Sequence, residues 1–192
     1  MRRILLYLLF VAISLTSQGQ RHMFAGLRAG YSSLQTGHLT SAGLCIDYDF
    51  GPRFGVGYNL TLGSDGLGNF YAHSGIGQTI TYYGYANYYV DESMAYLLTL
   101  SMFLPERFYF YIPIRDRTRV GLYVSPWGFD YLKNNESFSE SYELCGEVGL
   151  RWFFSPTNNL LVVPEAGIKR TYKTNQAGFS AGISLYFTNS DQ

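Results

Sequence analysis

Charged residues recur at alternate positions inside otherwise apolar stretches of this 192-residue chain. Within residues 142–154, Glu143, Glu147 and Arg151 share one face with Cys145, while leucine, valine and aromatic residues occupy the other face. Carboxylates and guanidinium groups on one enclosed face form ion pairs, because an unpaired buried charge is costly. The signs nearly balance, and we predict that the set pairs as a lumen charge network; the alternative is that members near the rim, such as Glu143 and Arg119, are solvated. The set is Arg28, Asp47, Arg119, Glu143, Glu147, Arg151, Glu165 and Lys169.

Catalytic or metal chemistry has weaker support in the sequence. His73 and Ser74 could gather with Asp65 and Asp130 at one rim, but no spacing holds these residues together. The two cysteines and three histidines lack the spacing of metal ligands. The glycines of residues 63–77 precede an expected strand and not a helix, unlike those of a phosphate-binding loop. We therefore predict no catalytic, metal-binding or cofactor-binding residues, and no cofactor.

The charged residues must be held by strands, and the clearest expected strand is the last one, Gly178 to Phe187. Large apolar residues alternate there with small and polar ones over ten residues, which is the length of a tilted membrane-crossing strand. One face suits lipid and the other suits a crowded lumen. A soluble lipocalin-like barrel or sandwich is the alternative, but its interior would be overfilled by five bulky residues per strand.

The rest of the chain contains further stretches of this kind separated by turns. The connections 64–77 and 128–141 are expected to be long loops at the end opposite the termini, and short turns are expected at the other end. Ten strands result, or eight if the region 94–114 does not form two strands; by its composition 94–103 could also be a buried helix. The expected strands are 23–32, 39–50, 54–63, 78–90, 94–103, 108–114, one marked by Val120, Leu122 and Val124, 142–154, 160–172 and 178–187.

Composition agrees with strands in lipid. Aromatic residues make up 18% of the chain and charged residues only 15%, and the formal net charge is zero, so no nucleic-acid partner is expected. No run of 18 apolar residues is present, which argues against a helical membrane protein. Arg2 and Arg3 followed by an apolar run predict a signal peptide over residues 1–19, with a retained membrane anchor as the alternative. The domain division is therefore 1–19 and a barrel over 20–192.

Cys45 and Cys145 lie in the middle of expected strands that are far apart in the sheet. Export would permit their oxidation to a disulfide, but a disulfide needs Cα atoms within about 7 Å of each other. We expect two free thiols facing the lumen.

The chain resembles the small outer-membrane β-barrel proteins of Gram-negative bacteria, the OmpA-like and PorT-like superfamily. The resemblance covers residues 20–187, and its most specific motif is the closing strand, with Ser180, Gly182, Leu185 and Phe187 at the matching places. It implies that these four residues form a signal read by the barrel-assembly machinery. In the family the final aromatic ends the chain, whereas here five residues follow Phe187.

Together these observations predict an all-β protein: a single closed, antiparallel, up-and-down transmembrane β-barrel in the outer membrane. Its expected partners are outer-membrane lipid, the barrel-assembly machinery and an unidentified surface or envelope protein. The expected role is structural or in surface interaction, with a lumen plugged by paired charges. Transport through a narrow pore is the alternative, followed by an outer-membrane enzyme.

Overall fold

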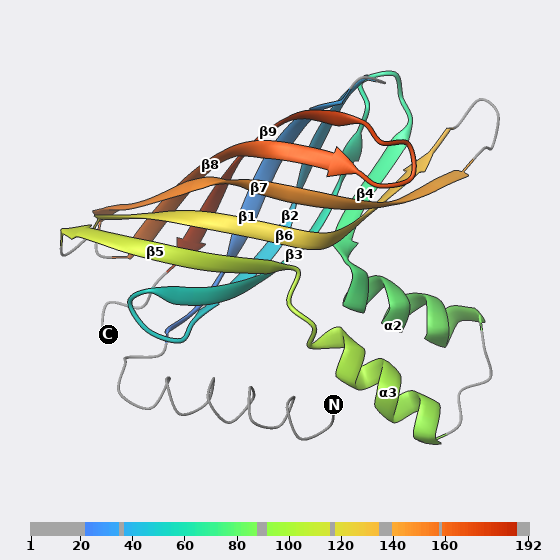
Figure 1. Cartoon of the computed structure of the whole chain (residues 1–192), viewed down its shortest axis with the longest axis horizontal. Helices are drawn as coiled ribbons and strands as arrows, with labels where there is room; N and C mark the ends of the chain where they lie inside the picture. The colour runs from blue at the N-terminus through green and yellow to red at the C-terminus, as the bar shows by residue number, and fades with distance from the viewer. Residues whose placement is uncertain are drawn as a thin grey trace.

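The computed structural model describes residues 22–34, 37–87, 92–115, 118–134, 140–157 and 159–187. The predicted signal peptide, residues 1–19, lies outside these ranges. Figure 1 shows a strongly tilted β-barrel with two helices beside it. The elements are β1 (His22–Leu34), β2 (Gly37–Asp49), β3 (Phe54–Ser64), β4 (Phe70–Gly75), α2 (Ile76–Asn87), α3 (Glu92–Met102), β5 (Arg107–Arg115), β6 (Thr118–Lys133), β7 (Glu140–Thr157), β8 (Leu160–Thr171) and β9 (Ala177–Phe187).

The strands close into an antiparallel barrel because β1 pairs with β9 as well as with β2. Leu27, for example, lies opposite Leu44 on one side and Leu185 on the other. The nine strands of the described chain fill eight positions in the wall, since β4 and β5 both pair with β3 and β6. The expected count of ten strands is therefore wrong, and the alternative of eight is correct.

β4 and β5 form one interrupted wall strand, with α2 and α3 inserted between them. Along β3, Leu60 lies opposite Ser74 and Gly57 lies opposite Arg107. The three steps from Leu60 to Gly57 match the three steps from Ser74 through Gly75 and Glu106 to Arg107, so the ladder continues in register across the insertion. Close to this point, β6 has a bulge between Ser125 and Gly128 in its pairing with β7.

Residues 78–87 of the expected strand 78–90 are thus helical, and so are residues 94–102, for which a buried helix was the alternative to a strand. Tyrosine and threonine favour strands locally, which explains the error, but tertiary contacts override that preference. The Thr81 hydroxyl donates to the Leu98 carbonyl oxygen at 2.7 Å and lies 2.9 Å from the Ser101 hydroxyl. Polar groups of each helix therefore find hydrogen-bond partners on the other helix. Among the described residues, no helix is long and apolar enough to span a membrane.

The expected long loops are also shorter than the sequence suggested. The 64–77 stretch contains β4, and only residues 65–69 connect it to β3. Asp65 accepts hydrogen bonds from the Leu67 and Asn69 amides, and Gly66 and Gly68 take the positive φ angles that close this turn. In the 128–141 stretch, β6 continues to Lys133 and β7 begins at Glu140. The 65–69 turn, the end of β6 at Lys133 and the start of β7 at Glu140 lie at the barrel end opposite His22 and Phe187, as the up-and-down order requires.

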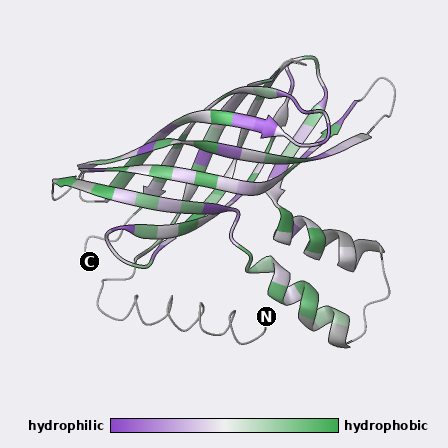
Figure 2. Ribbon diagram, in the orientation of Figure 1, coloured by the Kyte–Doolittle hydropathy of each residue, from purple (hydrophilic) through white to green (hydrophobic). Residues whose placement is uncertain are grey.

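The barrel has an apolar outside and a polar inside. On β9, Phe179, Ile183 and Phe187 are exposed, whereas Ser180 and Ser184 are buried. Figure 2 shows this alternation as bands along the strands. A water-soluble barrel would bury its large apolar side chains instead.

Candidate functional site in the barrel interior

Glu165 on β8 is the centre of an ion-pair network that crosses the lumen. Its carboxylate contacts the Arg28 guanidinium of β1, Arg107 Nη1 of β5 at 2.6 Å and Arg151 Nε of β7 at 3.2 Å. Glu147 shares Arg107, with Oε2 3.3 Å from Nη2. Each of these side chains is at most 9% exposed. Four strands around the wall are therefore tied together through one buried carboxylate.

Asp47 on β2 is the central carboxylate in the half of the network that lies nearer His22 and Phe187. Its Oδ2 lies 2.7 Å from Arg151 Nη2 and accepts the Tyr186 hydroxyl at 2.6 Å, while its Oδ1 accepts the Tyr109 hydroxyl at 2.8 Å. The Arg151 guanidinium also lies 3.8 Å from the Tyr109 ring centroid, within the range of a cation–π interaction. Next along this end, Arg119 pairs with Asp49. Aromatic and charged side chains thus contact one another in this half of the interior.

The half nearer the 65–69 turn contains a second cluster around His73 of β4. The imidazole Nδ1 lies 2.7 Å from Asp130 Oδ1, and Nε2 lies 2.9 Å from Glu106 Oε1. Both ring nitrogens face carboxylate oxygens, and where both carboxyl groups are ionised both nitrogens donate, which makes His73 an imidazolium. Asp130 also binds Lys169 Nζ at 2.6 Å and the Tyr71 hydroxyl at 2.8 Å.

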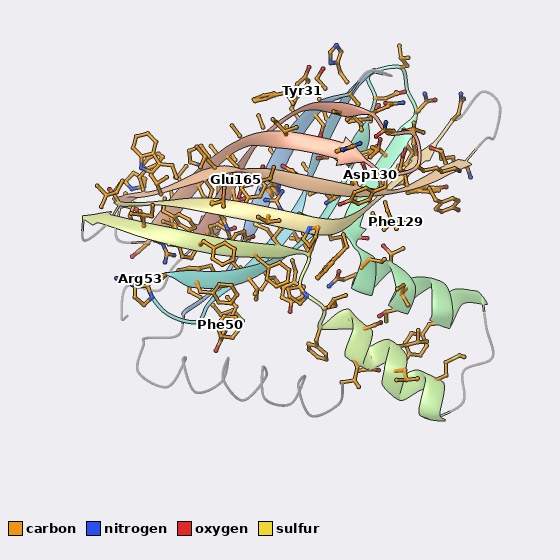
Figure 3. The ribbon with its side chains drawn as sticks, in the orientation of Figure 1. Tyr31, Phe50, Arg53, Phe129, Asp130 and Glu165 are labelled. Atoms are coloured by element: carbon orange, nitrogen blue, oxygen red, sulfur yellow. The ribbon has the colours of Figure 1, made fainter. Side chains whose placement is uncertain are left out.

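Strand register explains why these groups meet. His73 lies directly opposite Asp130 in the β4–β6 ladder, and Arg151 lies opposite Glu165 in the β7–β8 ladder. Small inward residues leave space for the long ones: a Cβ on Gly182 would stand 2.8 Å from Arg28 Nη2. Figure 3 shows Glu165 and Asp130 at different positions along the barrel axis, with Tyr31 and Phe50 near opposite ends of the barrel. Alternation of glycine with arginine and tyrosine thus lets side chains cross the interior.

The structure brings together seven of the eight residues predicted for the lumen charge network. The exception, Glu143, accepts the Thr174 amide at 2.6 Å and the Thr174 hydroxyl at 2.7 Å in the connection after β8. Within this set, Arg28 contacts Glu165 and Asp47 contacts Arg151. The seven are Arg28, Asp47, Arg119, Glu147, Arg151, Glu165 and Lys169.

Five members of the observed network were not in the predicted set: Asp49, His73, Glu106, Arg107 and Asp130. All but Asp49 lie in stretches expected to be loops or turns. For Arg107 a signal was available, since it continues the inward positions of Tyr109 and Tyr111 in β5. For Glu106 no local signal exists, because its place in the wall depends on the insertion before it.

Cys145 lies beside the His73 cluster, and both cysteines are free and buried as expected. Ligand atoms of His73, Asp130 and Cys145 all lie within 4.8 Å of one another. That compactness would suit a metal ion, but the Asp130 carboxylate is already held by Lys169 and Tyr71, and both His73 nitrogens face carboxylates. The contacts describe a charge-balanced hydrogen-bond cluster.

Charge balance holds over the whole interior of the described barrel. Six cationic groups, with His73 counted as protonated, face six carboxylates. An interior with equal numbers of opposed, paired charges has little net charge, and its side chains are held in place by one another. The cations are Arg28, His73, Arg107, Arg119, Arg151 and Lys169, and the anions are Asp47, Asp49, Glu106, Asp130, Glu147 and Glu165.

No protein-family model and no curated protein match this chain. Among solved structures, the chain is similar to the N-terminal β-barrel domain of Pseudomonas aeruginosa OprF, with a TM-score of 0.51 and 9% identity over 88% of this chain and 100% of that one. It is also similar to Ail, the attachment invasion locus protein of Yersinia pestis, with a TM-score of 0.50 and 9% identity over 88% of this chain and 97% of that one. The fold is that of the small outer-membrane β-barrels, which confirms at the level of the fold the resemblance to OmpA-like barrels.

Proposed function

We propose that this protein is an integral outer-membrane β-barrel with a structural or surface-interaction role and a lumen closed by its own side chains. The observation that carries the proposal is the inverted polarity of the barrel: large apolar residues outside and paired charges inside. Leu27, Leu44 and Leu60 lie side by side across three neighbouring strands, and each is more than half exposed. Such a continuous apolar surface marks contact with lipid or with another protein.

The height of the apolar surface supports lipid as its environment. On β7 the exposed residues Tyr142 and Trp152 are ten residues apart and bracket Leu144, Val148 and Leu150. With a rise of about 3.4 Å per residue and a tilt of about 40°, that distance spans about 25 Å, the usual height of the apolar band in such barrels. Aromatic contacts lie near both ends, including Tyr131–Tyr142 at one and Phe50–Phe54 at the other. They resemble the two aromatic girdles of membrane barrels.

The contacts that cross the interior support a closed lumen. Barrels of about eight strands have an interior just wide enough for side chains to fill. Here Arg107 and Arg151 reach from β5 and β7 to the same carboxylate on β8, and Tyr123 is fully buried beside them. We therefore favour a structural or interaction role over transport.

Planar bilayers test closure directly. The purified protein should give no reproducible single-channel steps, in membranes where a general porin added afterwards conducts. Well-defined steps from the unmodified protein, with an ion selectivity altered by Arg107→Gln, would show instead that the lumen charges line a pore.

Cell fractionation tests the location. The protein should be found in the outer-membrane fraction and should need detergent for extraction. Mass spectrometry of its mature amino terminus then tests whether cleavage occurs after Gly19. Recovery from the soluble periplasm without detergent would contradict the membrane proposal.

A further inference from the structure

The α2–α3 hairpin, defined here as residues 76–105, leaves the barrel from the middle of its wall. Gly75 and Glu106 flank it at adjacent places of one ladder along β3, between Leu60 and Gly57. Above and below this break the outward residues are apolar, for instance Leu62 of β3 and Phe110 of β5, each about half exposed. The hairpin therefore emerges inside the apolar band and not from either rim (Figure 1).

Its outer surface is strongly apolar. Leu97 and Phe103 are each more than 65% exposed, and further large apolar residues lie beside them. Within residues 76–105 the charged residues are Asp91 and Glu92, where the chain passes from one helix to the other. In water, so much exposed apolar surface on two short helices would be unfavourable. The exposed apolar residues of the hairpin are Ile80, Tyr85, Met94, Leu97, Leu100, Met102, Phe103 and Leu104.

Several of its polar side chains form hydrogen bonds between the two helices. The Thr81 hydroxyl bonds to the Leu98 carbonyl and contacts the Ser101 hydroxyl, and the Tyr85 hydroxyl donates to the Ala95 carbonyl at 3.2 Å. Gly77 lets the helices approach closely, because a Cβ there would overlap the Ser101 carbonyl oxygen. Small residues at the contact and hydroxyls bonded across it are characteristic of helices packed in membranes.

The base of the hairpin has its backbone carbonyls satisfied by side chains. Tyr58 of β3 donates to the Phe103 carbonyl at 2.8 Å, and Trp127 Nε1 of the β6 bulge donates to the Pro105 carbonyl at 2.8 Å. Gln78 Nε2 donates to the Met102 carbonyl at 2.8 Å. Non-helical backbone in the hydrocarbon region is tolerated only where its polar groups find such partners.

We infer that the α2–α3 hairpin lies within the hydrocarbon layer beside the barrel, with lipid acyl chains covering its apolar surface. The inference rests on the proposed membrane location, and it follows from the continuity of this surface with the apolar band. A helix of 12 residues is about 18 Å long, enough to reach from the middle of a hydrocarbon layer about 30 Å thick to its polar interface.

Site-directed fluorescence in lipid vesicles tests this placement. A thiol-reactive fluorophore is attached to Leu97→Cys on α3, to Ile112→Cys on the outer face of β5 and to Leu67→Cys in the 65–69 turn. The parent, whose Cys45 and Cys145 are buried, is the blank for labelling. We expect the Leu97 probe to be quenched by brominated acyl chains as strongly as the Ile112 probe, and to resist aqueous iodide. The Leu67 probe should show the opposite behaviour.

The controls separate the two proposals. Iodide quenching at position 97 with lipid quenching at position 112 would overturn the hairpin inference and leave the membrane barrel intact. Lack of quenching by either agent at position 97 would also overturn it, because another protein or a second copy would then cover the helix. Iodide quenching at position 112 would contradict the membrane proposal itself.

Discussion

His73 and Asp130 face each other across the β4–β6 ladder, with Nδ1 and Oδ1 2.7 Å apart. Both were expected in loops, yet both lie on wall strands and point into the barrel. Together with Glu106 on the other side of the imidazole, they form a carboxylate–imidazolium–carboxylate bridge that spans the break between β4 and β5. The interrupted wall strand is thereby held on its inner face by a charged bridge.

Removing the histidine should destabilise the barrel. His73→Ala leaves Glu106 with Arg107 at 3.5 Å as its remaining ion-pair partner and weakens the hold on Asp130. We expect the free energy of unfolding in lipid vesicles to fall by about 3–5 kcal/mol, the usual cost of breaking a buried ion pair. Urea titration followed by tryptophan fluorescence measures it. His38→Ala, which removes an exposed histidine beside Tyr31, should change it by about 0.5 kcal/mol or less. Equal effects of the two substitutions would contradict this account.

The central carboxylate gives a nearly isosteric test. Glu165→Gln keeps the shape of the side chain but removes the negative charge that faces Arg28, Arg107 and Arg151. Unfolding should need about 3–5 kcal/mol less free energy, because three guanidinium groups then share fewer anions. The matched control is Glu143→Gln, whose carboxylate lies at the Thr174 connection; about 1 kcal/mol or less is expected there. If Glu165→Gln leaves the free energy of unfolding unchanged, the network adds little to stability.

The outer face can be tested at two depths on one strand. Leu44 and Thr40 both point outward on β2, but Leu44 lies mid-strand between Leu27 and Leu60, whereas Thr40 lies near the end. Leu44→Arg should cost about 2–4 kcal/mol of folding free energy and Thr40→Arg about 0–1 kcal/mol, because the penalty for arginine falls toward the interface. Urea-dependent folding into vesicles measures both. The same cost at both positions would argue against a bilayer around the barrel.

Deleting residues 76–105 tests whether the hairpin is a separate module. Joining Gly75 to Glu106 leaves the β3 ladder in register, so the variant should still fold to a barrel with the parent's resistance to unfolding in mild detergent. Heat-dependent mobility on gels reads this out. A deletion of 76–104 is the matched control, because its one leftover residue shifts every following side chain of β5 to the opposite face. If both deletions abolish folding, the hairpin is needed to form the wall.

The alternation of residue types in the sequence was enough by itself to predict most strands of the barrel wall. Period-two patterns in 54–63 and 178–187 are local, so they reveal both the strand and which of its faces is apolar. The inward positions of Arg28, Asp47 and Arg151 followed in the same way. These positions were predictable because a strand turns successive side chains to opposite faces, whatever its neighbours are.

Only the tertiary structure decided two features: that β4 and β5 share the wall position next to β3, and which charged side chains pair with each other. Residues 78–103 are rich in tyrosine, threonine and leucine, which suit a strand or a buried helix locally, and only pairing of β4 and β5 with the same neighbours shows the insertion. Likewise, Arg28 meets Glu165 because β1 closes onto β9 with a particular register. Closure and register depend on contacts between residues distant in the chain, so a local pattern carries no record of them.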